Sequence, residues 1–156
     1  MKIVVLDGYT LNPGDLSWDE IAGLGELKVY DRTPPELVVE RSEGAAIVLT
    51  NKVILDARIL RSLPELRYIG VLATGYNVVD TAEADRLGIN VTNIPAYGTN
   101  SVAQLTFTML LYLVSKPYYY DTFVKSGAYS RSDSFTHHNE PFWELKGKRL
   151  GIIGLG

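Results

Sequence analysis

Residues 68–92 read YIGVLATGYNVVDTAEADRLGINVT, and their pattern indicates the fold class. It begins and ends with apolar runs of strand length, Tyr68–Leu72 and Ile89–Thr92. Between the runs, Asp80 offers a side-chain oxygen to the free amides at the start of a helix, and Gly88 is a residue type that commonly follows a helix end. A strand, a capped helix and a second strand form a βαβ unit, which predicts parallel strands.

The same alternation of apolar runs and helical patterns fills the first 95 residues. The runs are mostly apolar throughout, as expected for strands buried on both faces of a central sheet. They are Ile3–Leu6, Leu27–Tyr30, Ala46–Leu49, Tyr68–Leu72 and Ile89–Thr92. Right-handed crossovers and the spacing of the runs predict a five-stranded parallel sheet in the order 2-1-3-4-5, with helices on both faces. The predicted fold class is therefore α/β in three layers.

Residues that can cap a helix precede each of the four helices predicted in this region. They are Ser17, Thr33, Asp56 and Asp80. The spacing Thr33-Pro34-Pro35-Glu36 also forms a capping box with proline at the first helical position. Gly44 and Gly88 are placed to end the second and fourth helices. The sequence thus predicts helix starts as well as strands.

The second part of the chain begins with a long helical pattern that opens near Thr99 or Asn100. Its apolar residues, which include Val102, Leu105, Met109 and Val114, predict a largely buried helix. Lys116-Pro117 should end or kink this helix, and residues 118–126 should form another helix before Gly127. Residues 128–147 are irregular and predict a functional loop or an interdomain connection. Residues 148–153 read as a further buried strand.

Composition limits the classes of function. The chain has 156 residues, 46% of them hydrophobic and 21% charged, which suits one compact domain. A net charge of −3 argues against nucleic acid and membrane surfaces as partners, and the lack of cysteine excludes thiol chemistry and disulfides. The first apolar run is too short for a secretory signal and no stretch is long enough to span a bilayer, so a cytoplasmic protein is expected.

Two stretches that follow predicted strands could bind a ligand. In Gly70–Asp80, Thr74 and Gly75 lack bulk, so their backbone amides could approach an anion closely. In Val91–Gln104, a proline turn and a small-residue loop deliver the start of the long helix, a natural place for a ligand or a hinge. An ordinary turn explains the first stretch equally well, and a tightly packed helix cap is the favoured interpretation of the second stretch when it is taken alone.

The end of the chain offers a third pattern. Gly154-Leu155-Gly156 matches the first part of the G-x-G-x-x-G fingerprint that binds a pyrophosphate. The sequence ends within this pattern, so we expect the chain to stop inside a second domain. His137-His138 suggests a metal at first sight, but adjacent histidines project differently and no third ligand is evident, so a solvated loop is the better interpretation.

Three motifs taken in order resemble the D-isomer-specific 2-hydroxyacid dehydrogenases, in particular the glycerate dehydrogenase or hydroxypyruvate reductase branch. The motifs are ATGYNVVD at 73–80, TNIPAYGTNSVAQ at 92–104 and ELKGKRLGIIGLG at 144–156. The resemblance covers essentially the whole chain, including residues 7–15 and 48–53. Gln104 departs from the pattern, since many relatives have glutamate there, which affects the subfamily more than the fold.

The resemblance implies a domain organisation. Residues 1–98 would form a flavodoxin-like substrate domain, residues 99–147 an interdomain helix and loop, and residues 148–156 the start of a Rossmann domain for NAD or NADP. The whole protein would transfer a hydride between the nicotinamide cofactor and a small D-2-hydroxyacid or 2-oxoacid, as a homodimer.

The resemblance also implies roles for single residues. The amides of Thr74 and Gly75 would hold the substrate carboxylate, and Lys52, Tyr97 and Asn100 would lie along the cleft. The residues that would contact the cofactor are Thr106, Gly154 and Gly156. The family's catalytic histidine, glutamate and arginine follow the glycine-rich loop, so no catalytic residue is expected within this chain, and His137 and His138 are no substitutes. The 156 residues alone are expected to be inactive and to bind no cofactor.

Other functions of an α/β domain fit the sequence less well. A phosphoacceptor receiver should have clustered acidic residues after its first strand and another after its third, but only Asp7 and Thr50 stand there. A flavodoxin should have a hydroxyl-rich phosphate loop, whereas residues 8–13 contain one threonine and a bulky tyrosine. A binding or interaction module without enzymatic activity remains open. Whichever function holds, the surfaces that the resemblance implies would cover the apolar helix 100–115 are expected to be missing, so this helix should fold back onto its own domain or exchange with a second copy.

Overall fold

The structure, a computed structural model, describes residues 1–154. These residues form two compact units, Met1–Tyr97 and a second unit that begins at Gly98. The division lies next to the domain boundary expected at residue 98. The separate Rossmann start expected at residue 148 stays a prediction.

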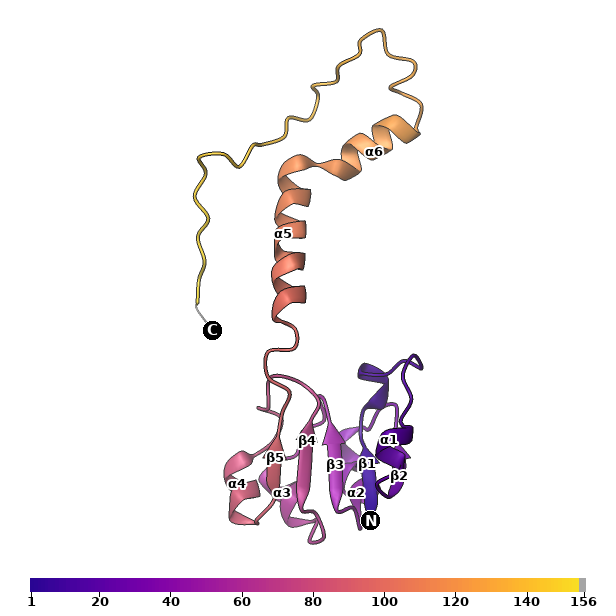
Figure 1. Cartoon of the computed structure of the whole chain (residues 1–156), viewed down its shortest axis with the longest axis vertical. Helices are drawn as coiled ribbons and strands as arrows, with labels where there is room; N and C mark the ends of the chain where they lie inside the picture. The colour runs from indigo at the N-terminus through magenta and orange to yellow at the C-terminus, as the bar shows by residue number, and fades with distance from the viewer. Residues whose placement is uncertain (155–156) are drawn as a thin grey trace. The chain divides into compact units, whose positions relative to one another are not determined.

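The first unit is built on a five-stranded parallel sheet (Figure 1). Its strands are β1 (Lys2–Val5), β2 (Glu26–Val29), β3 (Ile47–Thr50), β4 (Tyr68–Val71) and β5 (Asn90–Thr92). Every pairing is parallel, and the order is β2-β1-β3-β4-β5. The α/β class, the five strands and their order are therefore confirmed.

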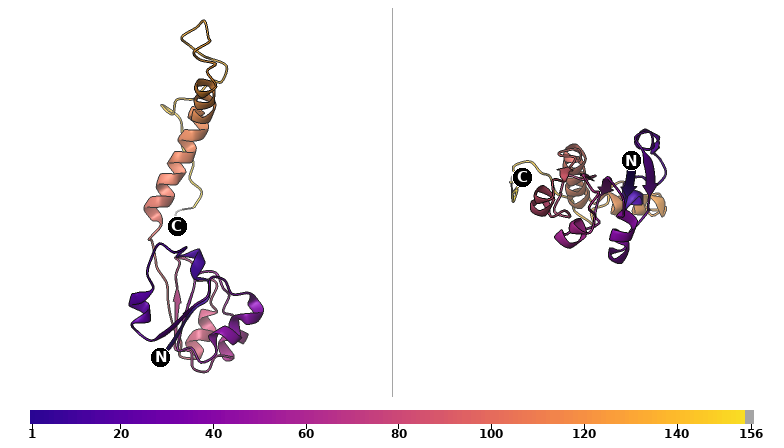
Figure 2. Two further views of the ribbon diagram at one scale, coloured as in Figure 1. Left: turned by 90° about the vertical axis from the view of Figure 1, so that its right-hand side faces the viewer. Right: turned by 90° about the horizontal axis from the view of Figure 1, so that it is seen from below.

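Short helices cover both faces of this sheet. The α-helices are α1 (Asp19–Ala22), α2 (Val38–Ser42), α3 (Ala57–Arg61) and α4 (Thr81–Arg86), and two 3-10 turns are η1 (Gly8–Thr10) and η2 (Pro35–Leu37). The left view of Figure 2 shows α1 on one face and α2, α3 and α4 on the other. Right-handed crossovers produce this division when the chain moves outward from β1 to β2 and then returns past β1 to β3.

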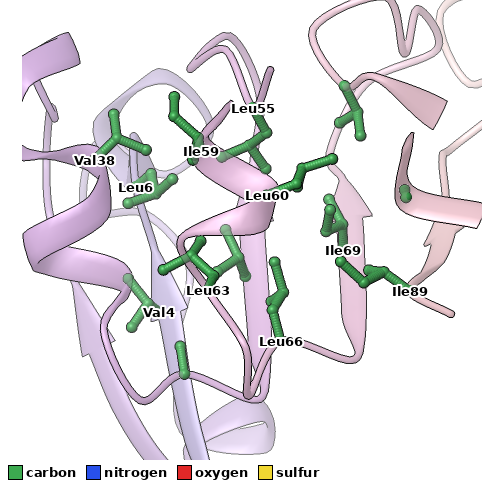
Figure 3. Close-up of a cluster of buried hydrophobic side chains, with 14 of the residues drawn as sticks. Val4, Leu6, Val38, Leu55, Ile59, Leu60, Leu63, Leu66, Ile69 and Ile89 are labelled. Atoms are coloured by element: carbon green, nitrogen blue, oxygen red, sulfur yellow. The ribbon is translucent and has the colours of Figure 1, made fainter. Parts of the chain in front are cut away.

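The main hydrophobic core lies between the sheet and the α2–α4 layer (Figure 3). Val4 of β1 and Ile69 of β4 are fully buried there, and Leu55 and Leu60 fill the space from the side of α3. Burying each such side chain contributes roughly 1.5–3 kcal/mol relative to exposure. The edge strand β2 is different, because its side chains alternate between exposed and half-buried rather than being buried on both faces as expected.

The structure confirms the helix caps predicted at Asp56 and Asp80. Asp56 accepts a hydrogen bond from the Ile59 amide at 2.8 Å, and Asp80 accepts one from the Glu83 amide at 3.0 Å. Gly88 ends the α4 region with a φ of +72°, as predicted.

The prediction of a capping box at Thr33 is wrong. Pro34 is extended, with ψ at 154°, because the following proline disfavours helical backbone at the preceding residue. The turn therefore begins one residue later, as the 3-10 segment η2 without a side-chain cap. The Thr33 hydroxyl instead accepts a hydrogen bond from the Arg41 guanidinium at 3.0 Å.

The second unit begins with two helices, α5 (Thr99–Ser115) and α6 (Pro117–Lys125), as predicted. Lys116 separates them in the left-handed conformation, with a φ of +48°. The expected burial of the long helix is wrong for this chain. No residue of α5 or α6 is buried, and Val102 and Leu113 are 66% and 70% exposed. Among the described residues, the second unit has no sheet or further helix that could cover them.

The chain after α6 has no regular secondary structure among the described residues, as expected for 128–147. The strand predicted over 148–153 is wrong, because a strand requires a hydrogen-bonded neighbour and no described residue pairs with this segment. Within residues 1–154, no helix combines the length and the apolar character needed to cross a bilayer.

Candidate functional site

The carboxyl ends of the parallel strands meet at one edge of the sheet, where open α/β folds bind their ligands. Asp7 lies just beyond β1, Lys52 just beyond β3, Thr74 and Gly75 beyond β4, and Asn93 directly after β5. The structure therefore brings Lys52, Thr74 and Gly75, three of the predicted site residues, to the same edge.

Asp7 organises the middle of this edge. Its side chain is only 4% exposed, and its two carboxylate oxygens accept hydrogen bonds from the backbone amides of Asn51 and Lys52, at 2.8 and 2.6 Å. The Asn51 side-chain amide also donates to the Thr10 hydroxyl at 2.9 Å. These contacts fix the loop after β3 against the loop after β1, so the backbone of Lys52 is anchored while its side chain is exposed.

Asp7 is not among the site residues predicted from the sequence. The available signal was a single carboxylate directly after a fully apolar strand, where burial is costly unless the charge is paired or hydrogen-bonded. Its partners are more than forty residues away in sequence, which no local pattern reveals.

The loop after β4 is joined to the loop after β5 by three hydrogen bonds. The Thr74 hydroxyl donates to the Ile94 carbonyl at 3.1 Å, the Asn93 side chain donates to the Thr74 carbonyl at 2.8 Å, and the Ile94 amide donates to the Ala73 carbonyl at 3.0 Å. Both the side chain and the carbonyl of Thr74 are therefore engaged. The loop is held in one arrangement by its neighbour.

The amides of this loop are not engaged in the same way. Within the described part of the chain, neither the Thr74 nor the Gly75 amide donates a hydrogen bond, and both residues are exposed. A Cβ built on Gly75 would meet only the Asn77 side-chain oxygen, at 3.4 Å, so the glycine leaves open space in front of the backbone. Two available amides on a fixed loop form a suitable receptor for a carboxylate.

Tyr97 has a different environment from the other predicted site residues of the first unit. It is 67% exposed and lines a cavity of about 460 Å³ together with Trp18, Leu72 and Ile94. Leu72 and Ile94 are the residues that flank the joined loops after β4 and β5. Tyr97 is therefore placed beside these loops on an apolar surface.

The remaining predicted residues belong to the second unit or lie beyond the described chain. Asn100 lies in the first turn of α5, and the Thr106 hydroxyl donates to the Val102 carbonyl of the same helix at 2.7 Å. Gly154 is exposed and has a φ of +92°, which favours glycine. Gly156 lies outside the described residues. The roles of these four residues stay predictions.

The expectation that His137 lies in a freely solvated loop is wrong. Its ring stacks on Phe123 with 3.8 Å between centroids, and its Nε2 shares a hydrogen bond with the Tyr119 hydroxyl at 2.6 Å. Lys116 forms an ion pair with Glu140 in the same region. These contacts attach the irregular segment to α6. Among the described residues, no group of three or more potential ligands is arranged to hold a metal ion.

The strongest electrostatic feature lies between α3 and α4. Glu83 receives hydrogen bonds from Arg86 and Arg61, and these contacts lower the pKa of the Glu83 carboxyl to about 2. Its side chain is 9% exposed, whereas both arginines are about 60% exposed. The cluster connects two helices of the first unit and is not part of the loops that carry Lys52, Thr74 and Gly75.

Comparison with protein-family models identifies the family of this chain. The model for the catalytic domain of the D-isomer specific 2-hydroxyacid dehydrogenases matches residues 3–140. The chain belongs to this family. The resemblance carried by the three sequence motifs is thereby confirmed.

Known relatives of this 2-hydroxyacid dehydrogenase chain agree with the family. The hydroxypyruvate reductase of Blautia hydrogenotrophica is 46% identical over 100% of this chain and 49% of its own length, and the glycerate dehydrogenase of Methylorubrum extorquens is 38% identical over 99% and 49%. A solved structure named as a putative D-isomer specific 2-hydroxyacid dehydrogenase, NAD-binding, from Polaromonas matches with a TM-score of 0.78 and 26% identity, over 99% of this chain and 48% of that one. The chain spans about half the length of these relatives.

Proposed function

We propose that this chain forms the substrate-binding part of an NAD- or NADP-dependent oxidoreductase that transfers a hydride between the cofactor and a D-2-hydroxyacid such as glycerate, whose oxidised form is hydroxypyruvate. The observation that carries the proposal is the pair of unengaged amides at Thr74 and Gly75, on a loop fixed at the ligand-binding edge of the sheet. The names of the two similar curated relatives support the substrate class.

The substrate carboxylate is bound by the Thr74 and Gly75 amides. Backbone amides recognise a carboxylate through charge-assisted hydrogen bonds, and they need no side chain that would fill the space in front of the loop. The Lys52 ammonium adds a positive charge from the neighbouring strand end. Tyr97 and Asn100 contact the rest of the substrate.

The cofactor is held by Thr106 and by the backbone of Gly154 and Gly156. The left-handed φ of Gly154 and the open space around it suit close approach of a pyrophosphate to the backbone. The Thr106 hydroxyl would have to leave the carbonyl of its own helix to donate to the cofactor. When bound, the nicotinamide supplies or accepts the hydride, and the residues of this chain bind and orient the acid.

A polypeptide of residues 1–156 alone should show no dehydrogenase turnover. The histidine, glutamate and arginine that the family uses follow the glycine-rich loop, and general acid/base catalysis alone contributes about 10²–10⁴-fold. The expected result is no change in nicotinamide absorbance above a blank with glycerate or hydroxypyruvate and either cofactor. Measurable turnover by this polypeptide would contradict this part of the proposal.

We further propose that the chain self-associates through α5. The apolar residues of this helix are largely exposed, among them Leu105 at 59%, Met109 at 56% and Leu113 at 70%. Fully burying a leucine or valine contributes roughly 1.5–3 kcal/mol, which favours covering this helix. The whole protein would be a homodimer, and the isolated chain would exchange α5 with a second copy. Folding of α5 onto its own first unit, the other form expected from the sequence, is less favoured because no residue of α5 is buried. A monomer at every concentration in sedimentation, with α5 unprotected, would contradict the exchange with a second copy.

The binding proposal can be tested by nuclear magnetic resonance on the 156-residue chain. Titration with D-glycerate should shift the Thr74 and Gly75 amide signals, because those protons would donate to the carboxylate. Gly75→Val should abolish these shifts by filling the space in front of the loop. Gly151→Val is the matched control, since a Cβ there meets nothing within 4 Å. Equal binding by both variants, or shifts that avoid residues 74–75, would contradict the proposal.

A further inference from the structure

A second cavity is lined by Lys52 but by no residue of the loop after β4. It has a volume of about 500 Å³ and lies between the segments that follow β1, β2 and β3, against the starts of η2 and α3. Neither Thr74 nor Gly75 lines it. Its volume falls within the range of about 300–1,000 Å³ that is typical of small-molecule sites.

The floor of this cavity is apolar. Val38 is 1% exposed and Ile59 is 7% exposed, and both belong to the hydrophobic core. Val53 packs against the same core from the loop after β3. A ligand that enters this cavity would therefore place an apolar group against side chains that the fold already holds rigid.

Three cations surround the apolar floor. Arg32, Lys52 and Arg58 line the cavity, and none of them forms an ion pair within residues 1–154. The Arg32 guanidinium carbon lies 6.0 Å from the centre of the Tyr9 ring, and the backbone carbonyl of Arg32 accepts a hydrogen bond from Arg41. The three charges are thus available to an anion.

The carboxylates beside these cations are already engaged. Both oxygens of Asp7 accept backbone amides, and Asp56 accepts the Ile59 amide at 2.8 Å as the cap of α3. A carboxylate that moved to pair with a lining arginine would leave backbone amides without acceptors, which is costly. Among the described residues, neither lining carboxylate is therefore paired with a lining cation.

We propose that this cavity binds a small organic anion with an apolar body and a phosphate or carboxylate head. The apolar body lies on Val38, Val53 and Ile59, and the head lies between Arg32, Lys52 and Arg58. Arginine suits this role because its planar guanidinium donates two hydrogen bonds to one phosphate or carboxylate group. The cavity also lies at the β1/β3 fork, where the direction of the crossovers reverses and ligands of such folds commonly bind.

This site goes beyond the proposed function, because it does not use the Thr74 and Gly75 amides, although it shares Lys52 with the proposed substrate site. The test is a nuclear magnetic resonance titration of the 156-residue chain with phenyl phosphate, which has both the apolar body and the charged head. The amides of Thr33, Val53 and Ile59 should shift. Inorganic phosphate, which lacks the apolar body, and benzyl alcohol, which lacks the charge, should each bind at least about tenfold more weakly.

Two substitutions test the charged head directly. Arg58→Gln and Arg32→Gln should each weaken phenyl phosphate binding by about fivefold, the effect of one exposed charge contact. Arg67→Gln is the control, because Arg67 is also exposed and does not line the cavity. An unchanged spectrum away from residues 32–33 and 52–59 would show that the variants are folded.

Three results would overturn the inference. Equal affinity in Arg58→Gln, Arg32→Gln and Arg67→Gln would show that the cations do not hold the head group. Equal affinity for phosphate and phenyl phosphate would show that the floor does not contribute. Shifts confined to the Thr74 and Gly75 amides would assign the anion to the proposed substrate loop instead, which would support the proposed function and exclude this site.

Discussion

The two units of the chain differ in how they satisfy their apolar side chains. The first unit buries a continuous core, from Val4 on β1 to Ile89 before β5. Among the described residues of the second unit, none is buried, although α5 carries leucine, valine and methionine along most of its length. The first unit therefore contains what it needs to fold, whereas the second needs a surface to cover it. The candidate substrate loop lies on the self-sufficient unit.

The largest effect on stability is expected when a leucine of the core, rather than a leucine of α5, is truncated to alanine. Leu60→Ala should lower the free energy of unfolding by about 2–5 kcal/mol, because Leu60 is 1% exposed and the substitution leaves a cavity. Leu113→Ala, at a residue 70% exposed, should change it by less than about 0.5 kcal/mol in the monomer. Urea denaturation followed by Trp18 fluorescence, with Trp143 replaced by phenylalanine, measures both. Equal effects would remove the distinction between the units.

A second test concerns Asp7, whose carboxylate holds the loop after β3 against the loop after β1. Asp7→Ala should destabilise by about 3 kcal/mol, since it leaves the Asn51 and Lys52 amides without their charged acceptor. Hydrogen exchange of these two amides should accelerate more than exchange across the sheet. Asp15→Ala serves as a control, because Asp15 is exposed and forms no side-chain hydrogen bond or ion pair within residues 1–154. A similar loss in both variants would contradict the anchoring role.

A smaller effect is expected at the glycine that ends α2. Gly44 has a φ of +69° and nothing within 4 Å of a built Cβ, so Gly44→Ala should cost roughly 1–2 kcal/mol through backbone strain alone. Gly23→Ala is the comparison, since no positive φ is found there and the Cβ would make ordinary contacts at 3.5 Å. The difference between the two denaturation midpoints isolates the strain. No difference would argue against a left-handed Gly44.

The smallest effect at neutral pH is expected at the α3–α4 ion pairs, whose arginines are mostly exposed. Hydrogen bonds from Arg86 and Arg61 lower the pKa of Glu83 from 4.5 to about 2. The stabilisation is therefore fully present above pH 4.5 and is lost as the pH falls toward 2. Glu83→Gln should flatten the pH dependence of stability in this window. Unchanged pH dependence in the variant would show that the pairing does not stabilise the fold.

Much of the first unit could be predicted from the sequence, because its signals are local. The apolar runs marked all five strands, and Asp56 and Asp80 cap the helices that follow them. The errors arose where neighbours decide the outcome. A second proline moved the start expected at Thr33, and the run at 148–153 lacks the partner that a strand requires among the described residues.

The candidate site was predictable only in part. Thr74 and Gly75 were recognisable as a small, turn-forming pair after a strand, and the structure places them with Lys52 at one sheet edge. The anchoring role of Asp7 depends on contacts across more than forty residues. Burial of α5 depends on what covers it, which the helical pattern does not contain.

Hydrogen exchange of the whole chain at several concentrations tests the difference between the two units most directly. We predict that amides of β1, β3 and β4 are strongly protected at every concentration, because their core is internal to the first unit. Amides of α5 should exchange rapidly in dilute solution and become protected as the concentration rises and copies associate. Protection of α5 equal to that of the sheet at the lowest concentration, or rapid exchange in both, would contradict the account.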